Sequence, residues 1–271
     1  MPFSDDAYSL LYLWSQRTIY IGAMFELSCF TPAASALVIS MEKPLRIRSA
    51  ASPDFITTRS ALIPAGVSVE VEDTDQLMAC CYLDALGRDL AAFKTLMQRQ
   101  VGNLWIDSRI ERQQIASYEL IYRTRMPAAQ TYKTLLESIF PPAAVCNAVP
   151  GARAEIARAV EIIRCDPVSN PSNLQLAQQV GLTEAQLQRQ FKQITGIPIR
   201  RYRLWHRLFV TATLMMLGKT LTDAALEAGF SDSSHFNHAF RSILGMKPSF
   251  IFQRRDRIFI YAGGDVEAGE G

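Results

Sequence analysis

The sequence contains little histidine and no paired cysteines, and these shortages exclude several kinds of site. It has three histidines among 271 residues, and the first of them is His206. Because metal sites in enzymes commonly gather several histidines, we expect no metal site and no cofactor. The cysteines are odd in number and lack the C-x-x-C spacing, which argues against a disulfide framework and a zinc knuckle. We expect them to be reduced and mostly buried: Cys29, Cys80, Cys81, Cys146 and Cys165.

The chain also lacks long apolar runs. No stretch approaches the ~20 consecutive apolar residues that a membrane-spanning helix needs. The first residues, Met1-Pro2-Phe3-Ser4-Asp5-Asp6, are acidic and do not resemble an export signal. These absences predict a cytoplasmic protein without a membrane partner.

Positive charge is scarce in the first half and concentrated in the second. Residues 1–150 contain 13 Lys and Arg against 15 Asp and Glu, whereas residues 170–260 contain 12 against 5. A basic segment behind a neutral-to-acidic one suits a chain whose second half binds a polyanion. Charge alone does not distinguish DNA from RNA or a membrane.

Short strands are predicted in the first part of the chain. Val67, Val69 and Val71 alternate with polar residues, which is the period of a half-buried strand. Turn signals such as Pro64-Ala65-Gly66 separate the segments and favour a small antiparallel barrel or sandwich. Cys80 and Cys81 would then point to opposite faces, so at most one is a candidate sensor thiol. The expected strands span residues 18–24, 35–41, 45–49, 54–63, 67–72 and 76–83.

Helices are predicted to follow. Residues 87–123 carry spaced apolar residues in charged stretches, and a further helix is expected over 128–140. Three prolines and a glycine make 141–151 the best linker candidate. We therefore divide the chain into a regulatory domain, a DNA-binding domain and a disordered tail: residues 1–145, 146–261 and 262–271.

An internal repeat carries the most information about function. The pattern Ala177-x-x-x-Gly181-Leu182-Thr183 recurs as Ala225-x-x-x-Gly229-Phe230-Ser231, and each copy continues into a Phe, a basic residue, a Gly and a Pro at similar spacing. A repeat at a fixed period indicates a repeated supersecondary unit. The Ala allows a close helix crossing, the Gly ends the first helix with a positive φ, and Thr183 or Ser231 caps the second helix. Thr183-x-x-Gln186 also forms a capping box. Each copy is thus predicted to be a helix-turn-helix unit.

The second helix of each unit has a polar outer face. Phe236, Ala239, Phe240 and Ile243 share one apolar face of the second copy, while its other positions carry hydrogen-bonding side chains. Such side chains suit the reading of base edges in a major groove, whereas any one of them alone would be an ordinary solvated residue. The candidate DNA-binding residues are Ala185, Gln188, Arg189, Lys192, Ser233, Ser234, His235, Asn237, His238 and Arg241.

One continuous helix is predicted between the units. Residues 198–217 contain no internal Pro or Gly, and such a helix measures about 30 Å at 1.5 Å per residue. Successive major grooves on one face of DNA lie ~34 Å apart, so both units can insert together. Trp205 is expected to be core rather than a stacking platform. An arginine cluster at the helix start is expected either to contact phosphates or to be solvated: Arg200, Arg201, Arg203 and Arg207.

Residues 172–252, about 80 of the 271, resemble the DNA-binding domain of the AraC/XylS family of transcription regulators. The resemblance is carried by Ala225-x-x-x-Gly229-Phe230-Ser231, His235-Phe236 and Phe240-Arg241-x-x-x-Gly245-x-x-Pro248. It implies a seven-helix domain with base contacts at Gln188 and Arg189 in the first unit and at Ser234, His235, Asn237 and His238 in the second. Family members usually have Arg or Lys where His238 stands, which affects the inferred base preference and not the fold.

The strands and helices upstream are similar in pattern to the cupin-like sensor and dimerisation domain of that family. The expected fold class is therefore α+β, with a small cupin-like barrel or sandwich and its helices before an all-α domain. The leading hypothesis is a dimeric regulator, an activator or a repressor, that contacts double-stranded DNA and RNA polymerase and responds to a small effector or a partner protein. An effector-independent dimeric regulator is a second hypothesis. A DNA-tethered alkyl-transfer enzyme is a third, but such enzymes need a Pro-Cys-His setting that no cysteine here has, so we expect no enzyme.

Overall fold

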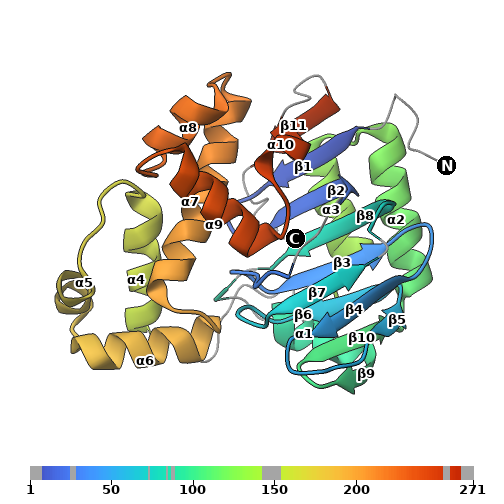
Figure 1. Ribbon diagram of the computed structural model, residues 1–271, viewed down its shortest axis with the longest axis horizontal. Coiled ribbons are helices and arrows are strands. Elements are labelled where there is room, and N and C mark those ends of the chain that lie inside the picture. The colour runs from blue at the N-terminus through green and yellow to red at the C-terminus, as the bar shows by residue number, and fades with distance from the viewer. Residues whose placement is uncertain are drawn as a thin grey trace, which may run out of the picture.

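The N-terminal part of the chain folds into two β-sheets that carry three helices on one side (Figure 1). A computed structural model describes residues 8–24, 29–72, 74–83, 85–86, 89–141, 154–252 and 257–263. The strands are β1 Ser9–Leu13, β2 Thr18–Ala23, β3 Ala36–Ser40, β4 Leu45–Ser49, β5 Ile56–Thr58, β6 Ser60–Ile63, β7 Val69–Glu72, β8 Leu77–Tyr82, β9 Met97–Val101, β10 Leu104–Ser108 and β11 Ile258–Ala262. The helices here are α1 Asp89–Leu96, α2 Glu111–Thr124 and α3 Ala128–Ser138.

The larger sheet has eight strands in the order β11-β1-β2-β8-β3-β6-β10-β9, and the smaller has three in the order β5-β4-β7. All pairs are antiparallel except β1 with β11. The predicted α+β class is confirmed, and of the expected barrel or sandwich the structure has two separate sheets. The expected strand 54–63 is divided into β5 and β6. In β7, Val69 and Val71 are buried while Glu70 and Glu72 are half-buried, as the alternation predicted.

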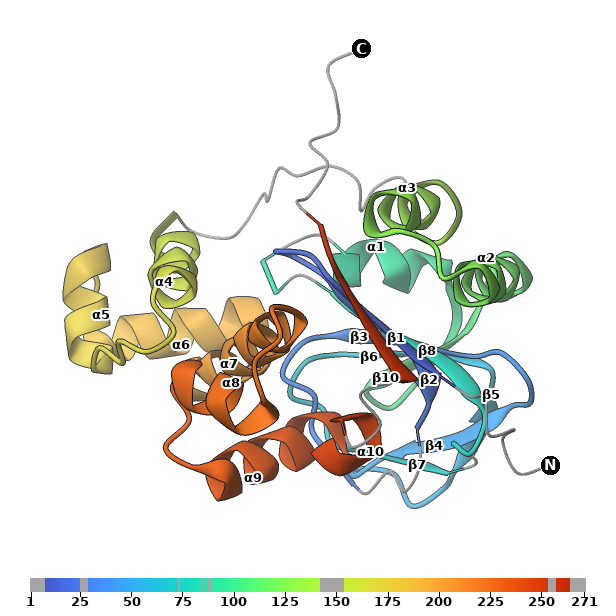
Figure 2. The same cartoon turned by 90° about the horizontal axis from the view of Figure 1, so that it is seen from above.

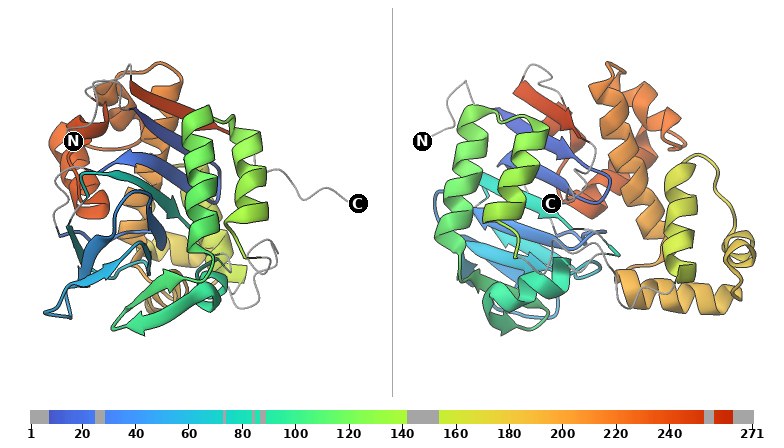
Figure 3. Two further views of the ribbon diagram at one scale, coloured as in Figure 1. Left: turned by 90° about the vertical axis from the view of Figure 1, so that its right-hand side faces the viewer. Right: turned by 180° about the vertical axis from the view of Figure 1, so that it is seen from behind.

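The larger sheet separates two apolar cores. One face, with Leu10, Tyr12 and Cys81, packs under α1, α2 and α3. The other face, with Tyr20 and Cys80, packs partly against the smaller sheet and partly against the C-terminal helices. Figure 2 shows these layers from above, and Figure 3 shows α2 and α3 lying side by side across the first face. The sheet is therefore covered on both faces, and the C-terminal helices form part of its cover.

A hairpin was missed by the sequence analysis, which expected helices throughout residues 87–123. β9 and β10 lie within that range and are joined at Gly102, which has a φ of 56°. The Gly102-Asn103 pair is a two-residue turn signal that a helical pattern on either side concealed. The helix expected over 128–140 is confirmed as α3.

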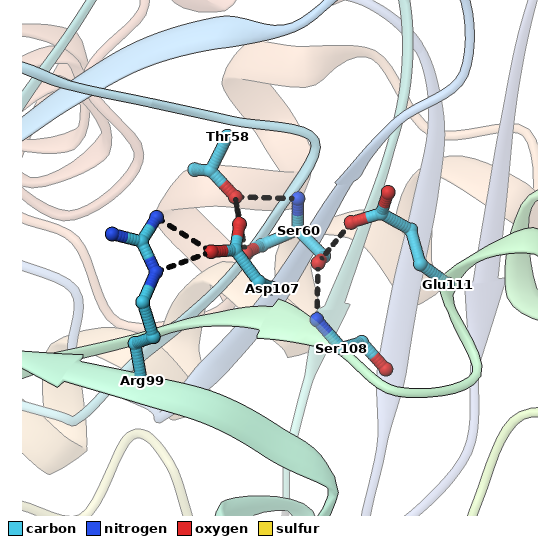
Figure 4. Close-up of polar contacts among 6 residues, drawn as sticks. All are labelled: Thr58, Ser60, Arg99, Asp107, Ser108 and Glu111. Atoms are coloured by element: carbon cyan, nitrogen blue, oxygen red, sulfur yellow. Dashed lines mark hydrogen bonds and ion pairs between the residues drawn. The ribbon is translucent and has the colours of Figure 1, made fainter.

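A polar cluster fixes this hairpin to its neighbours (Figure 4). Asp107 has a φ of 62° and accepts hydrogen bonds from Thr58 Oγ1 at 2.8 Å and Arg99 Nε at 2.7 Å. The fully buried Ser60 donates to Glu111 Oε2 at the start of α2. These bonds hold the unusual backbone at Asp107, so the hairpin, β6 and α2 keep one arrangement.

The cysteines fit the sequence analysis in part. Cys80 and Cys81 point to opposite cores, as predicted for adjacent strand residues. Burial raises the pKa of Cys80 to about 12 and that of Cys81 further, so neither is a reactive thiolate at neutral pH. Cys29 and Cys165 are exposed, so burial does not extend to most of the cysteines described. Cys146 lies outside the described residues.

The C-terminal part consists of helices followed by one strand. The helices are α4 Ala154–Cys165, α5 Asn173–Val180, α6 Glu184–Thr195, α7 Ile199–Met216, α8 Leu221–Glu227, α9 Ser233–Leu244 and α10 Pro248–Phe252. β11 then joins the N-terminal sheet. The domain boundaries at 145 and 261 remain a prediction, and β11 ties the end of the proposed DNA-binding segment to the other domain. The expected linker lies largely, and the expected tail almost wholly, outside the described residues.

Candidate nucleic-acid interface

The first repeat copy forms a helix-turn-helix unit from α5 and α6. Gly181 ends α5 in the left-handed conformation with a φ of 73°. Thr183 then caps α6: its hydroxyl accepts from the Gln186 N–H, and the Gln186 side chain accepts from the Thr183 N–H. The predicted glycine turn and capping box are both confirmed. Leu187 and Phe191 anchor the inner face of α6, since both are fully buried.

The second copy forms the same unit from α8 and α9, with a different cap. Gly229 has a φ of 92°, as the repeat predicted. The prediction that Ser231 caps α9 is wrong, because Asp232 takes this position and accepts from the His235 N–H at 2.8 Å. Ser231 donates its hydroxyl hydrogen to Asp232 instead, at 2.8 Å. A carboxylate is a stronger acceptor than a hydroxyl beside the positive end of a helix dipole.

The two outer faces have matching layouts. The four candidate residues on α6, from Ala185 to Lys192, follow one another at intervals of three, one and three positions. Four candidates on α9, from Ser234 to Arg241, have the same intervals, so each set lies on one face of its helix. Every one of these eight side chains is exposed. The pairs that correspond are Ala185 and Ser234, Gln188 and Asn237, Arg189 and His238, and Lys192 and Arg241.

Two further candidates lie beside this face. Ser233 is exposed in the first turn of α9. His235 is half-buried, with its ring edge-on to Phe230 at 5.3 Å between centroids. Its Nδ1 lies 3.2 Å from the Ser231 hydroxyl. His235 therefore also holds the turn before α9.

The helix α7 connects the units without interruption, as predicted, and its 18 residues span about 27 Å. Three of the arginines near its start bind backbone carbonyls. Arg203 donates to Pro171 O at 2.7 Å and Arg207 to Pro167 O at 3.1 Å, so both fix the segment between α4 and α5. Arg201 donates to the carbonyls of Thr31 and Ser242. The expectation of phosphate contacts or solvation is therefore corrected for these three, and Arg200 alone of the four is exposed.

His206 lies on the same helix and is half-buried. Its Nε2 is 3.1 Å from the Arg164 carbonyl oxygen, and its ring stacks on Phe209. Burial lowers the pKa of His206, although the hydrogen bond to Arg164 acts in the opposite direction. Burial therefore favours the neutral form of this histidine.

The ends of both candidate recognition helices contact the N-terminal domain. Gly196, which ends α6, lies so close to Gly66 that a Cβ on Gly66 would be 2.7 Å from the Gly196 carbonyl oxygen. Near the end of α9, Ser242 O accepts from the Thr31 N–H at 3.1 Å. The N-terminal domain therefore contacts both units.

A pocket of about 590 Å³, including its open mouth, lies between the sheet and these helices. Among the residues that the structure describes, no charged side chain lines this pocket. Burial raises the pKa of Tyr20 to about 12, so its hydroxyl stays neutral. The sequence analysis missed this pocket because its walls come from β1, β2 and β8 on one side and from α7, α9 and α10 on the other. Trp205, expected to be core, is half-buried in its wall with its ring 4.7 Å from that of Tyr82.

A second pocket of about 410 Å³ adjoins the first. Thr18, Tyr82, Trp205 and Phe209 line both. Its remaining walls are more polar and include the side chains of Arg164 and His206. An apolar chamber and a polar chamber thus meet at the boundary between the two domains.

Two capped helix-turn-helix units on one rigid connecting helix define a DNA-binding module. Residues 176–254 match the family model described as a helix-turn-helix domain. The chain is also similar to the transcriptional activator RhaS of Escherichia coli O139:H28, with 39% identity over 82 residues, which are 30% of each chain. The chain thus spans 30% of the length of the curated relatives it matches. This C-terminal segment is a helix-turn-helix domain.

The whole fold is similar to that of ToxT from Vibrio cholerae O395. The likeness covers 88% of this chain and 98% of ToxT, with a TM-score of 0.57 and 14% identity. ToxT of strain SCE256 with an unsaturated fatty acid bound matches with a TM-score of 0.55 and 11% identity, over 88% of this chain and 95% of that one. Among the residues described here, no helix is both long and apolar enough to cross a bilayer.

Proposed function

We propose that this protein is a sequence-specific DNA-binding transcription regulator that inserts α6 and α9 into successive major grooves. The observation that carries the proposal is the matched pair of exposed polar faces on these helices. Arginine pairs bidentately with guanine and Asn or Gln with adenine, so Arg189, Gln188 and Asn237 are assigned to base reading. Lys192, Arg241 and the hydroxyls of Ser233 and Ser234 suit phosphates or base edges.

The separation of the units supports simultaneous insertion. The connecting helix α7 spans about 27 Å, and the units extend beyond it at both ends. The grooves to be reached are ~34 Å apart. A single protomer therefore covers two turns of DNA on one face, and a homodimer would cover two such sites.

The N-terminal domain, residues 1–145, is assigned to regulation and dimerisation. The pocket at the boundary is concave and lined mainly by apolar side chains, as small-molecule sites commonly are. Its apolar chamber suits an alkyl chain. Arg164 lines the adjoining chamber, and a guanidinium is a suitable partner for a carboxylate head. The unsaturated fatty acid bound to ToxT makes long-chain fatty acids the effector class to test first. Measurement of transcription from a promoter that carries the selected site would distinguish an activator from a repressor.

Selection of bound sequences from random DNA, followed by affinity measurements, tests the DNA-binding proposal. Replacing Gln188 and Arg189 together by Ala should abolish the preference for the selected site over random DNA. The matched control is Gln179→Ala, an exposed residue on α5 away from the proposed face. Loss of preference in the control alone, or its retention in the double variant, would contradict the assignment.

Filling the pocket tests the effector proposal. Ala212 is buried on α7 and lines the apolar chamber, so Ala212→Phe should displace a fatty acid and leave the outer faces of α6 and α9 intact. Binding is measured with cis-parinaric acid, a fluorescent unsaturated fatty acid, and with oleyl alcohol as an uncharged competitor. Val210→Leu is the control, since Val210 is on the same helix and does not line the chamber. If both variants bind cis-parinaric acid equally well, the fatty acid does not bind in this pocket. If the intact chain does not bind it, an effector-independent regulator is favoured.

A further inference from the structure

The C-terminal strand is an unusual part of this fold. β11 follows the second helix-turn-helix unit in the sequence and pairs in parallel with β1, the first described strand, from Ser9 with Ile258 to Leu13 with Ala262. It forms the edge of the eight-stranded sheet (Figure 1). The Gly263 N–H extends the attachment by donating to Leu13 O at 3.2 Å. The DNA-binding helices are thus attached to the N-terminal domain at both of their chain ends.

Side chains on β11 enter both cores. The Phe259 ring packs edge-on against the Tyr8 ring. The Arg125 guanidinium lies over the Phe259 ring, with Cζ 4.2 Å from the ring centroid. Tyr261 stacks on Tyr12 with 5.0 Å between centroids. On the opposite face, Ile258 packs with the core that includes the C-terminal helices. β11 is therefore held by side-chain contacts as well as by backbone pairing.

The two attachments differ in length. Phe252 ends α10 and Ile258 begins β11, so six residue steps limit their separation to roughly 20 Å even when extended. At the other end, Pro141 and Ala154 are separated by thirteen steps, which permits roughly 45 Å. While β11 is paired with β1, the short segment after α10 keeps the second unit near the sheet edge. The longer segment between Pro141 and Ala154 restrains the position of the helices much less.

β11 also pairs with the strand that lines the pocket. Leu11 and Leu13 of β1 form part of the apolar wall and are the register partners of Ile260 and Ala262. The opposite wall includes Phe252, which precedes the short attachment. Both walls of the pocket are therefore connected through β11, and they face each other only when the helices are docked.

We propose that β11 is a releasable strap that keeps the DNA-binding helices docked on the N-terminal sheet, and that its separation from β1 opens the boundary pocket. The effector part of this inference rests on the proposed function. The docking part does not, because it concerns contacts within the chain alone. A ligand that binds only the docked state loses apparent affinity in proportion to the docked fraction. Bound ligand conversely favours the paired strap.

Two truncations of the full chain test the strap. One ends after Arg257 and removes β11, and the matched control ends after Gly263 and keeps it. The reporter of docking is the Thr31 amide, whose hydrogen bond to Ser242 crosses between the domains. In the shorter chain the Thr31 amide should exchange with solvent much faster, and the radius of gyration should increase. The affinity for cis-parinaric acid should fall roughly tenfold if a tenth of the molecules stay docked. Unchanged exchange and unchanged size relative to the control would overturn the proposal.

A second variant covers the case in which the shorter chain fails to fold. The double substitution Phe259→Ala and Tyr261→Ala keeps the backbone and removes the contacts with Tyr8, Arg125 and Tyr12. The same changes are expected at smaller amplitude, and their absence in a folded double variant would overturn the proposal. Saturating oleic acid should slow exchange of the β11 amides in the intact chain. If the intact chain binds neither DNA nor fatty acid, the proposed function fails, whereas the Thr31 amide still reports on the strap.

Discussion

Gly66 and Gly196 meet backbone to backbone at the boundary between the domains. Their φ angles are 81° and 80°, and a Cβ on either would lie within 3.0 Å of a carbonyl oxygen on the other side. Glycine is needed at Gly66 for two reasons, the left-handed backbone and the close approach. The contact fixes the end of α6 relative to the N-terminal sheet.

Replacement of Gly66 by Ala should therefore weaken docking as well as stability. The left-handed conformation alone costs about 1–2 kcal/mol for a residue with a Cβ, and the 2.7 Å approach to Gly196 O forces a backbone shift in addition. Gly102→Ala is the matched control, since it has a φ of 56° and its nearest neighbour would be 3.7 Å away. Thermal unfolding and amide exchange at the end of α6 measure the difference. Equal effects of the two substitutions would show that the close contact contributes nothing.

Arg189 is expected to read a base. Arg189→Ala should cost about 1–3 kcal/mol of binding to the selected site and relax the preference at one position. Arg189→Lys should restore charge without the planar fork, and hence only part of the specificity. Binding to selected and random duplexes at two salt concentrations measures both effects. If Arg189 contacts only phosphate, both duplexes lose affinity equally and the salt slope falls by about one unit.

His206 should make stability depend on pH. Its pKa is lowered by burial below the reference value of 6.5. As the pH falls below 6.5, the unfolded chain takes up a proton that the folded chain resists, so the free energy of unfolding decreases. Urea unfolding at several pH values between 8 and 5 should show this decrease, and His206→Gln should reduce it. The control is His238→Gln, at an exposed position, and an identical reduction in both variants would argue against burial as the cause.

The ion pair of Arg17 and Asp89 should be important for the N-terminal domain. Arg17 donates to both Asp89 oxygens at 2.8 Å and to Tyr132 at 2.8 Å, and both charged side chains are almost fully buried. Asp89→Asn leaves a buried guanidinium without its counter-charge, which typically costs 3–5 kcal/mol. Replacing the pair by Met and Leu should cost less, because no uncompensated charge remains. Denaturant unfolding of the three chains distinguishes these cases, and a double variant less stable than Asp89→Asn would contradict the explanation.

The sequence by itself determined the two DNA-binding units. Gly181, Thr183, Gly229 and the apolar anchors of α6 and α9 act within one unit of the chain, so their spacing was sufficient to predict helix, turn and helix. The uninterrupted helix α7 followed for the same reason. The sequence pattern did not determine the N-cap of α9, because Ser231 and Asp232 are both suitable acceptors. The backbone geometry places Asp232 in the capping position.

Only the tertiary structure decided how these units attach to the rest of the protein. β11 has the apolar sequence of a strand, but its partner β1 lies at the other end of the chain, and no local pattern records such a pairing. The arginines of α7 have the composition of a phosphate-binding cluster, yet Arg201, Arg203 and Arg207 bind carbonyls brought to them by folding. The boundary pocket arises in the same way, because its two walls come from separate domains and exist as a site only when the domains dock.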